Sequence, residues 1–165
     1  MAIKVGDKLP DTTFMTMGAD GPKPMTTAEV FGGKKVALFA VPGAFTPTCH
    51  KTHMPGFVAR MDELRQKGFD TVACTSVNDV FVMTEWAKAT NATGKVMMLA
   101  DGAADFAKKI GLDMDLSARG LGVRSKRYAM AVSDGVVRVL NIEEAPGAVS
   151  SSSAETLCSM VDKSL

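Results

Sequence analysis

The sequence predicts an α/β fold in which a central mixed β-sheet is flanked by helices, and three observations support this. The runs Val36–Val41, Asp70–Val77 and Lys95–Ala100 are largely apolar, as strands buried on both faces are. Helical patterns separate these runs, and strands that alternate with helices form parallel sheets. Near the end of the chain, Ser133-Asp134-Gly135 joins two further runs and predicts a hairpin, which makes the sheet mixed.

Length and composition favour one globular domain over residues 1–165. The chain is 46% hydrophobic and 22% charged, enough to bury a core. Its net charge is +1 with both signs mixed, so we expect neither a nucleic-acid partner nor a charged membrane surface. No apolar run approaches the ~18 residues of a membrane span, and the first residues lack the apolar core of a signal peptide. Three cysteines argue against a disulfide scaffold and for a reducing compartment, and we expect the cytoplasm.

A short strand and a short helix precede the first core strand. The strand lies near Thr12–Met17, and the segment Gly18–Pro24 that follows is rich in turn residues. Thr26 and Glu29 have the spacing of a capping box, so we expect a helix to begin there and to end at Gly32-Gly33.

Local signals also predict the elements after the second core strand. Asp79 is placed to cap a helix that runs to Ala89, and Ser152 with Glu155 is placed to cap the last helix. We also expect a short helix at Ala103–Ile110 and a basic loop with glycines at Arg119–Lys126. The two strands of the hairpin are expected at Arg127–Val132 and Val136–Ile142.

The turn that follows Val41 joins the first core strand to the first long helix. Thr46 suits the N-cap and Pro47 the first helical position, which puts Cys49 third in the helix. Unpaired backbone N–H groups and the positive end of the helix dipole lie there, so a cysteine in this position loses its proton more readily than a free one. Further along, Pro55 should kink the helix, because it lacks an N–H and clashes with the preceding turn.

The helix alone is not sufficient to ionise such a thiol at neutral pH. A helix end contributes about 0.3–1 kcal/mol, or about 2 kcal/mol when partly buried, whereas ionising most of a free thiol needs about 2.7 kcal/mol. We therefore expect a fixed cation from elsewhere in the chain, together with the hydroxyl of Thr46 from three residues upstream.

The order of elements is the thioredoxin-like plan, a β-α-β unit followed by β-β-α with a cysteine at the start of the first long helix. Where thioredoxins carry two cysteines three residues apart, this chain has Thr46 and Cys49. The pattern Pro42-x-x-x-Thr46-x-x-Cys49 resembles the active-site signature of the peroxiredoxins. Four segments, spread over nearly the whole chain, are similar to the type II (peroxiredoxin 5-like) subfamily: Pro42–Cys49, His53–Phe57, Ser76–Trp86 and Lys126–Met130.

The resemblance implies a thiol-dependent peroxidase and a role for each matching residue. Cys49 is expected to be the peroxidatic thiolate, which attacks a peroxide and becomes a sulfenic acid. The Thr46 hydroxyl bonds the sulfur and the peroxide, Pro42 shields the site from water, and Gly43 belongs to the substrate-binding turn. Arg127 supplies the cation, because a guanidinium can stabilise a thiolate and also hold developing oxygen charge.

Other polar residues near the site are given secondary roles. Lys126 is the neighbour of Arg127, and neighbouring residues of a strand point to opposite faces, so it is second choice as the cation. Arg124, in the preceding loop, is third. We interpret His50 as solvated, and His53, which shares a helix face with the cysteine, as a structural hydrogen-bonding residue that could tune the site.

The other two cysteines leave alternatives open. Cys74 lies within a core strand, and it is either a buried side chain or a resolving cysteine that closes a disulfide with Cys49, as in some type II relatives. Joining the two needs Cα atoms within about 7 Å, and therefore unwinding of the first helical turn. Cys158 lies on the apolar stripe of the last helix and is interpreted as core. Other relatives place a resolving cysteine before that helix, where this chain has Ser150–Ser153, which excludes their route.

The sequence therefore predicts an antioxidant enzyme that reduces hydrogen peroxide and small alkyl hydroperoxides without a metal or an organic cofactor. The resemblance implies glutaredoxin with glutathione, or thioredoxin, as the reductant, and the sequence does not choose between them. It also implies a homodimer, for which Phe45 and Phe81 are interface candidates. Two rival hypotheses are a thioredoxin-like disulfide reductase, which needs a second thiol beside Cys49, and a peroxide sensor, in which the sulfenic acid is long-lived.

Overall fold

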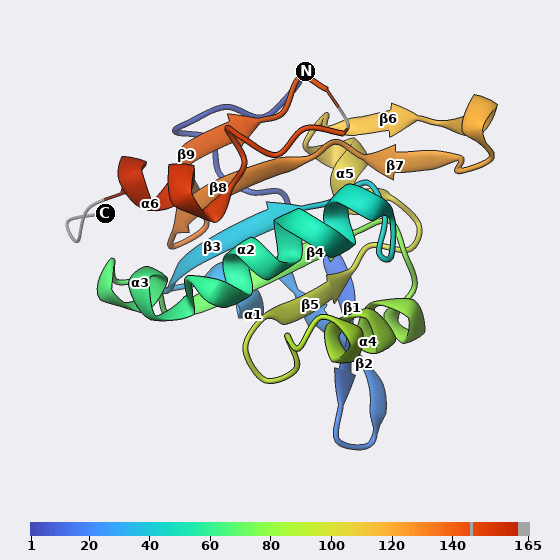
Figure 1. Cartoon of the computed structure of the whole chain (residues 1–165). Coiled ribbons are helices and arrows are strands. Elements are labelled where there is room, and N and C mark those ends of the chain that lie inside the picture. The colour runs from blue at the N-terminus through green and yellow to red at the C-terminus, as the bar shows by residue number, and fades with distance from the viewer. Residues whose placement is uncertain (146, 162–165) are drawn as a thin grey trace.

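The fold is built on a mixed β-sheet that runs through the middle of the molecule (Figure 1). A computed structural model describes residues 1–145 and 147–161. Within them, seven strands form the sheet in the order β2-β1-β5-β4-β3-β8-β9. Their bounds are β1 Thr13–Gly18, β2 Gly21–Thr26, β3 Lys35–Ala40, β4 Thr71–Ser76, β5 Met97–Ala100, β8 Tyr128–Ser133 and β9 Val136–Ile142. Pairs β3–β4 and β4–β5 are parallel and the other pairs are antiparallel, which confirms the predicted mixed sheet.

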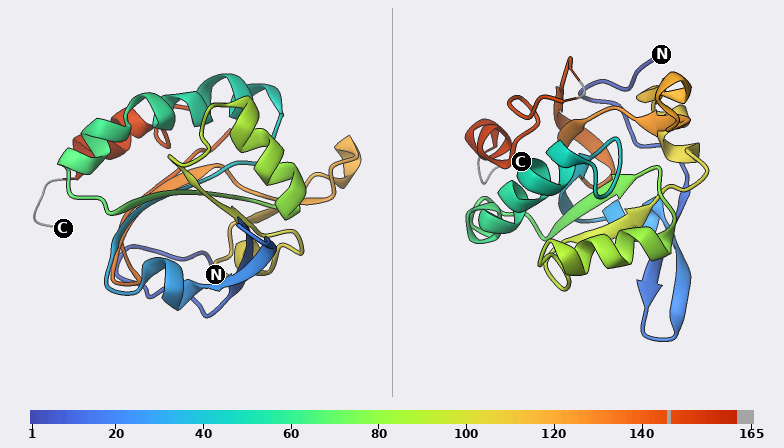
Figure 2. Two further views of the ribbon diagram at one scale, coloured as in Figure 1. Left: turned by 90° about the horizontal axis from the view of Figure 1, so that it is seen from below. Right: turned by 45° about the vertical axis from the view of Figure 1, so that its right-hand side comes forward.

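Helices cover both faces of the sheet (Figure 2). On one face lie α1 (Thr27–Phe31) and α5 (Asp105–Lys109), packed on a core that includes Phe14, Phe31 and Phe106. The other face carries the larger core, with Phe39, Phe57 and Trp86. Its helical segments are the π-helical turn η1 (Cys49–His53), α2 (Met54–Ala59), α3 (Met61–Gln66), α4 (Val80–Ala89) and α6 (Ala154–Met160). None of the helices in the described residues has the length and hydropathy needed to cross a bilayer.

The central strands explain why the predicted core runs were recognisable. In β3 and β4 every residue after the first is buried, because helices cover both faces. The β3–β4 register places Phe39 opposite Cys74, so both side chains enter the core under α2. On the other side of β3, Ala40 pairs with Tyr128 at the start of β8. The end of β3 and the beginning of β8 therefore lie side by side at one edge, next to the turn that carries Cys49.

Two hairpins were not predicted correctly. The segment expected to be only turn-rich contains β2, which pairs with β1 and includes Pro22 and Pro24. Proline is tolerated there because β2 is an edge strand, whose outward N–H groups need no ladder partner. The basic loop Arg119–Lys126 contains the strand β7 (Val123–Ser125), which pairs with β6 (Asp113–Asp115) beyond the short 3₁₀ turn η2 (Ser117–Arg119). The strands β6 and β7 have three residues each, which is too short to show an alternating apolar pattern in the sequence.

The predicted turn of the last hairpin is confirmed. Asp134 and Gly135 connect β8 to β9 with φ of 48° and 77°. Two positive φ angles in succession give a turn whose twist matches that of the flanking strands, and an Asp-Gly pair adopts it readily. Strand β8 pairs with β9 on one side and with β3 on the other, so the residues that precede β8 lie beside the turn that carries Cys49.

Two helix starts differ in detail from prediction. Around Pro55 the first long helix widens into the π-helical turn, where the Met54 N–H donates to the Cys49 carbonyl. This accommodates the missing N–H of Pro55, and the helix breaks again at Arg60 between α2 and α3. The last helix is capped by Ser153 rather than Ser152, because the Ser152 side chain bonds a buried carboxylate instead.

Candidate active site

The turn after β3 places Cys49 in the first turn of a helix, as its sequence predicts. Helical structure begins at Pro47, and the His50 N–H donates to the Thr46 carbonyl at 2.9 Å, so Cys49 is third in the helix. Phe45 precedes this start with a φ of 65°, a left-handed conformation that costs a non-glycine residue roughly 1–2 kcal/mol. Strain of this kind clusters at functional sites, and here it turns the chain sharply into the helix.

The Cys49 sulfur has two hydrogen-bond donors within reach. The Thr46 hydroxyl oxygen and the Arg127 Nη2 each lie 2.9 Å from Sγ. Cys49 is 0% exposed and Arg127 is 2% exposed, so a full positive charge is buried against this sulfur. A buried guanidinium needs a charge or strong acceptors beside it, and a thiolate is one.

Strand geometry explains why Arg127 reaches the site and its neighbour does not. Arg127 directly precedes β8, whose first residue pairs with the last residue of β3. Arg127 is buried whereas Lys126 is exposed, as alternation along an extended chain requires. The structure therefore brings together the cysteine, the hydroxyl and the guanidinium that the sequence singled out.

The Thr46 hydroxyl faces two acceptors with a single proton. Its oxygen lies 2.6 Å from the Gly43 carbonyl oxygen and 2.9 Å from the Cys49 sulfur. When the proton points to Gly43, the hydroxyl lone pairs face the sulfur and can accept a hydrogen bond from a group beside it. When the proton points to the sulfur, the hydroxyl stabilises a thiolate.

Arg124 closes the outer side of the turn, a role that the sequence did not reveal. Its Nη1 donates to the Pro42 carbonyl at 3.3 Å. A Cβ added to Gly43 would meet Arg124 Nη1 and Thr46 Cγ2 at 3.0 Å each, so only glycine leaves this packing undisturbed. Pro42 itself is buried.

Both histidines after Cys49 make specific contacts. The interpretation of His50 as solvated is wrong, because it is half-buried, accepts from the Trp86 indole N–H at 3.1 Å and stacks on Phe45. His53 is 1% exposed, and its Nδ1 lies 3.0 Å from Arg127 Nη1. The four-residue spacing from Cys49 was the sequence signal for His53, but its partner Arg127 could not be read from that spacing.

The other cysteines are buried free thiols. Cys74 lies in the same apolar cluster as Cys49. Burial raises the pKa of the Cys74 thiol well above its ordinary value, a charge on Cys49 raises it further, and Arg127 lowers it. Burial also raises the pKa of Cys158, to about 11, with the Glu63 carboxylate as the next contribution. A raised pKa lowers the fraction of thiolate, the form of cysteine that acts as a nucleophile.

The arrangement suits nucleophilic chemistry at a small oxidant. It offers one sulfur, one cation and one hydroxyl that can either donate or accept. Among the described residues, no three His, Cys, Asp or Glu side chains converge in a way that could hold a metal ion.

The chain is similar to known proteins over nearly its whole length. A profile of the Redoxin family matches residues 4–157. Peroxiredoxin-2E of Arabidopsis thaliana, a chloroplastic protein, is 51% identical over 160 residues, which cover 94% of this chain and 68% of the relative. The reduced Prx3 of Vibrio vulnificus in complex with hydrogen peroxide is 47% identical, with a TM-score of 0.91 over 96% of this chain and 98% of that one. Peroxiredoxin 5 of Alvinella pompejana is 37% identical, with a TM-score of 0.78 over 86% and 90% of the two chains.

Proposed function

This chain belongs to the type II, peroxiredoxin 5-like peroxiredoxins of the Redoxin family, and from that premise we propose how its own residues reduce a peroxide and how they are restored. It is a thiol-dependent peroxidase. We propose Cys49 as the nucleophile, with Thr46 and Arg127 as the groups that activate it. The observation that carries this proposal is the pair of donors, each 2.9 Å from the Cys49 sulfur.

In the proposed reaction the Cys49 thiolate attacks the outer oxygen of a hydroperoxide. A sulfur–oxygen bond forms, the oxygen–oxygen bond breaks, and the sulfur becomes a sulfenic acid that keeps the outer oxygen with its proton. The inner oxygen leaves as an alkoxide or hydroxide and takes a proton from water. Arg127 is placed to stabilise first the thiolate and then the negative charge that moves onto the peroxide oxygens.

Thr46 is the residue over which the peroxide would enter. Cys49 is fully buried, whereas Thr46 is half-buried and Phe45 is 50% exposed, so the hydroxyl lies between the sulfur and the surface. When the Thr46 hydroxyl donates to the Gly43 carbonyl, its oxygen can accept a hydrogen bond from the O–H of the peroxide and orient it. A small outward movement of the turn Pro42–Thr46 would open this route, and we propose hydrogen peroxide and small alkyl hydroperoxides as the substrates.

Glutathione with glutaredoxin is the reductant that the site supports best. The buried Cys74, whose pKa is raised, is a poor nucleophile toward a Cys49 sulfenic acid. A glutathione thiolate would instead attack the sulfenic sulfur and displace hydroxide, which takes a proton to become water, and glutaredoxin would then reduce the mixed disulfide. Thioredoxin is the alternative, and it requires that Cys74 form a disulfide with Cys49 first.

Mass spectrometry after one equivalent of hydrogen peroxide distinguishes the two routes. Without glutathione we expect a Cys49 sulfenic acid, which dimedone traps. With glutathione present we expect a glutathione adduct on Cys49, and Cys74→Ser should give the same products. A Cys49–Cys74 disulfide as the main product would instead assign Cys74 the resolving role and favour thioredoxin.

A disulfide reductase is disfavoured by the position of the thiols. Thr46 occupies the place of the second cysteine of a dithiol site, and Cys74 and Cys158 are both buried. A peroxide sensor uses the same Cys49 chemistry, but with a sulfenic acid that persists in the presence of glutathione. The mass-spectrometric time course therefore tests that alternative as well.

We propose that the exposed aromatic residues beside the site form a homodimer interface. Phe45 is 50% exposed and Phe81 is 62% exposed. The Ala44 N–H donates to the Asn78 Oδ1 at 3.0 Å, so the turns that precede these two residues are held together. Replacing Phe81 by Asp is expected to shift the sedimentation coefficient from that of a dimer to that of a monomer, and an unchanged value would locate any dimer elsewhere.

A reducing compartment, of which the cytoplasm is the simplest, is our proposal for localisation. Its support is that all three cysteines are free thiols. Fractionation of cells that express the protein tests it, and recovery in an oxidising compartment would contradict it.

A further inference from the structure

His53 lies behind Arg127, on the side away from the sulfur. Its Nδ1 is 3.0 Å from Arg127 Nη1, and its Nε2 is 2.9 Å from the carbonyl oxygen of Ser152. A carbonyl oxygen only accepts, so Nε2 carries the proton, and Nδ1 is left to accept from the guanidinium. The two contacts together fix one tautomer and one orientation of the ring.

The imidazole of His53 is neutral at neutral pH. Burial lowers its pKa to about 4, the Arg127 charge lowers it too, and the Ser152 carbonyl and the Glu143 charge act in the opposite direction. Neutrality is what the geometry requires, because a protonated ring would present an N–H to the N–H groups of Arg127.

Glu143, just after β9, fixes the Ser152 carbonyl. Its carboxylate accepts from the Ser152 N–H at 2.8 Å and the Ser152 hydroxyl at 2.6 Å, and from the Ser150 N–H at 2.8 Å. Burial raises the pKa of Glu143, but hydrogen bonds from Ser150, Ser151 and Ser152 outweigh it and lower the pKa to about 2. The Glu143 N–H also donates to the Arg127 carbonyl at 2.9 Å, so the same residue ties down the backbone of the arginine.

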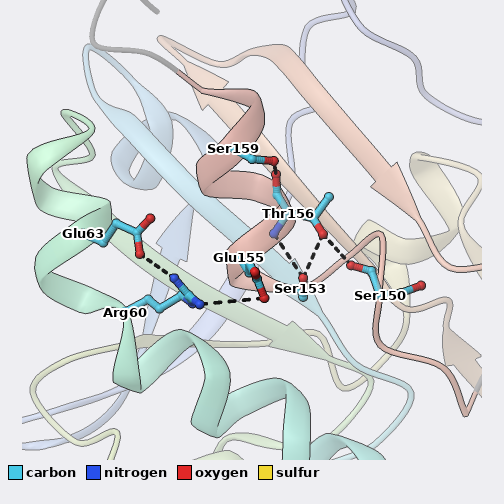
Figure 3. A network of polar contacts seen from close by, with 7 residues as sticks. All are labelled: Arg60, Glu63, Ser150, Ser153, Glu155, Thr156 and Ser159. Atoms are coloured by element: carbon cyan, nitrogen blue, oxygen red, sulfur yellow. Dashed lines mark hydrogen bonds and ion pairs between the residues drawn. The ribbon is translucent and has the colours of Figure 1, made fainter.

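The serine segment is anchored to the start of α6 as well (Figure 3). The Thr156 hydroxyl donates to the Ser150 carbonyl at 2.7 Å, and the Thr156 N–H donates to the Ser153 hydroxyl at 3.1 Å. In the same view, Arg60 connects the end of α2 to Glu155 of α6. The segment Ser150–Ser153 is therefore a fixed support, with the Ser152 carbonyl directed at His53.

We propose that His53 is a positioning residue: supported by the segment Ser150–Ser153 and Glu143, it aims the Arg127 guanidinium at the Cys49 sulfur. The inference rests on the proposed function of Cys49 and Arg127 and adds the reason why the guanidinium presents Nη2 to the sulfur. The chain of contacts runs from Glu143 through Ser152 and His53 to Arg127 and Cys49.

Two variants of His53 separate its two contacts. The Oδ1 of His53→Asn takes the place of Nδ1, so it can still accept from Arg127 but no longer reaches Ser152. The Nε2 of His53→Gln takes the place of the ring Nε2, so it can still donate to Ser152, but Arg127 Nη1 loses the acceptor that Nδ1 provides. The readouts are the second-order rate constant for hydrogen peroxide and the pH profile of Cys49 alkylation.

We expect His53→Gln to lower the peroxide rate constant about tenfold and to move the alkylation profile to higher pH. The reason is that the Arg127 guanidinium would no longer be held with Nη2 pointing at the Cys49 sulfur. His53→Asn keeps the acceptor for Arg127 but loses the support of Ser152, so we expect its rate to fall only about threefold, with a smaller movement of the profile in the same direction. Equal effects of the two variants, or no movement of the profile in His53→Gln, would overturn the proposal.

A further variant keeps the test valid if His53→Gln does not fold. Glu143→Gln weakens the hold on Ser152 while leaving His53 in place, and we expect a fall in rate of about threefold with a shift of the alkylation profile in the same direction. An unchanged profile in a folded Glu143→Gln protein would contradict the proposal. If the natural protein itself lacked peroxidase activity, the proposed function would fail, whereas the alkylation profiles would still decide the role of His53.

Discussion

Replacing Cys49 by serine is expected to abolish peroxide turnover, with a loss of at least about a thousandfold. A serine hydroxyl stays protonated beside Arg127 where a thiol can ionise, and an oxygen nucleophile cannot form the sulfenic acid on which the cycle depends. The measurement is the rate of hydrogen peroxide consumption under single-turnover conditions and in the presence of glutathione with glutaredoxin. The fold should be retained, because oxygen replaces sulfur in the same hydrogen-bonding environment.

The other two cysteines are the matched controls for this prediction. Cys158→Ser removes a buried thiol of α6 and should leave the rate unchanged per folded molecule. Cys74→Ser should slow turnover modestly or leave it intact, depending on the reductant. Full peroxidase activity in Cys49→Ser would show that the nucleophile is elsewhere and would remove the basis of the proposed site.

The start of the site could be predicted because its signals are local. Thr46, Pro47 and Cys49 are separated by three residues or fewer, and the preference of each for its helical position does not depend on the rest of the fold. The structure confirms the helix start and the place of the cysteine in it. It adds that the Thr46 hydroxyl faces the sulfur and the Gly43 carbonyl rather than a helix N–H.

The choice of Arg127 needed more than local signals. The helix end alone stabilises a thiolate too weakly, so the sequence predicts that a cation from elsewhere is needed. Strand alternation favours Arg127 over Lys126 for that role. Only the family resemblance connects Arg127 to Cys49, which lies 78 positions away. The structure shows the physical basis of that link, because β3 and β8 are neighbours in the sheet.

The support behind Arg127 could not be predicted at all. His53 meets the Ser152 carbonyl across 99 positions, and nothing in either segment encodes that pairing. Serine suits a helix cap, so the sequence alone favours Ser152 for that position. In the structure Ser153 caps the helix, and the Ser152 hydroxyl donates to Glu143. Contacts of this kind are decided by packing of α6 and α2 on the same face of the sheet, which local propensity does not describe.

Replacing Arg127 by alanine is expected to lower the peroxide rate constant about a hundredfold to a thousandfold. The substitution removes the buried charge from the sulfur and the donor that faces the developing oxyanion, and it leaves the Nδ1 of His53 without the donor from Arg127. Ionisation of the buried thiol then becomes less favourable, so the pH profile of Cys49 alkylation should move to higher pH. Stopped-flow kinetics and alkylation across a pH series measure the two effects separately.

Arg127→Lys and Arg124→Ala show which property of the guanidinium matters. Arg127 uses one nitrogen for Cys49 and another for His53, whereas a lysine has a single ammonium group, so Arg127→Lys should keep the charge but lose about tenfold in rate. Arg124 lies at the same turn but donates to Pro42 rather than to the sulfur, and Arg124→Ala should stay within about threefold. If Arg124→Ala were as damaging as Arg127→Ala, the net charge of the turn rather than an aimed guanidinium would be what activates Cys49. If Arg127→Ala changed neither the rate nor the alkylation profile, the helix end and Thr46 alone would have to account for the ionisation of the sulfur, and Arg127 would lose the role proposed for it.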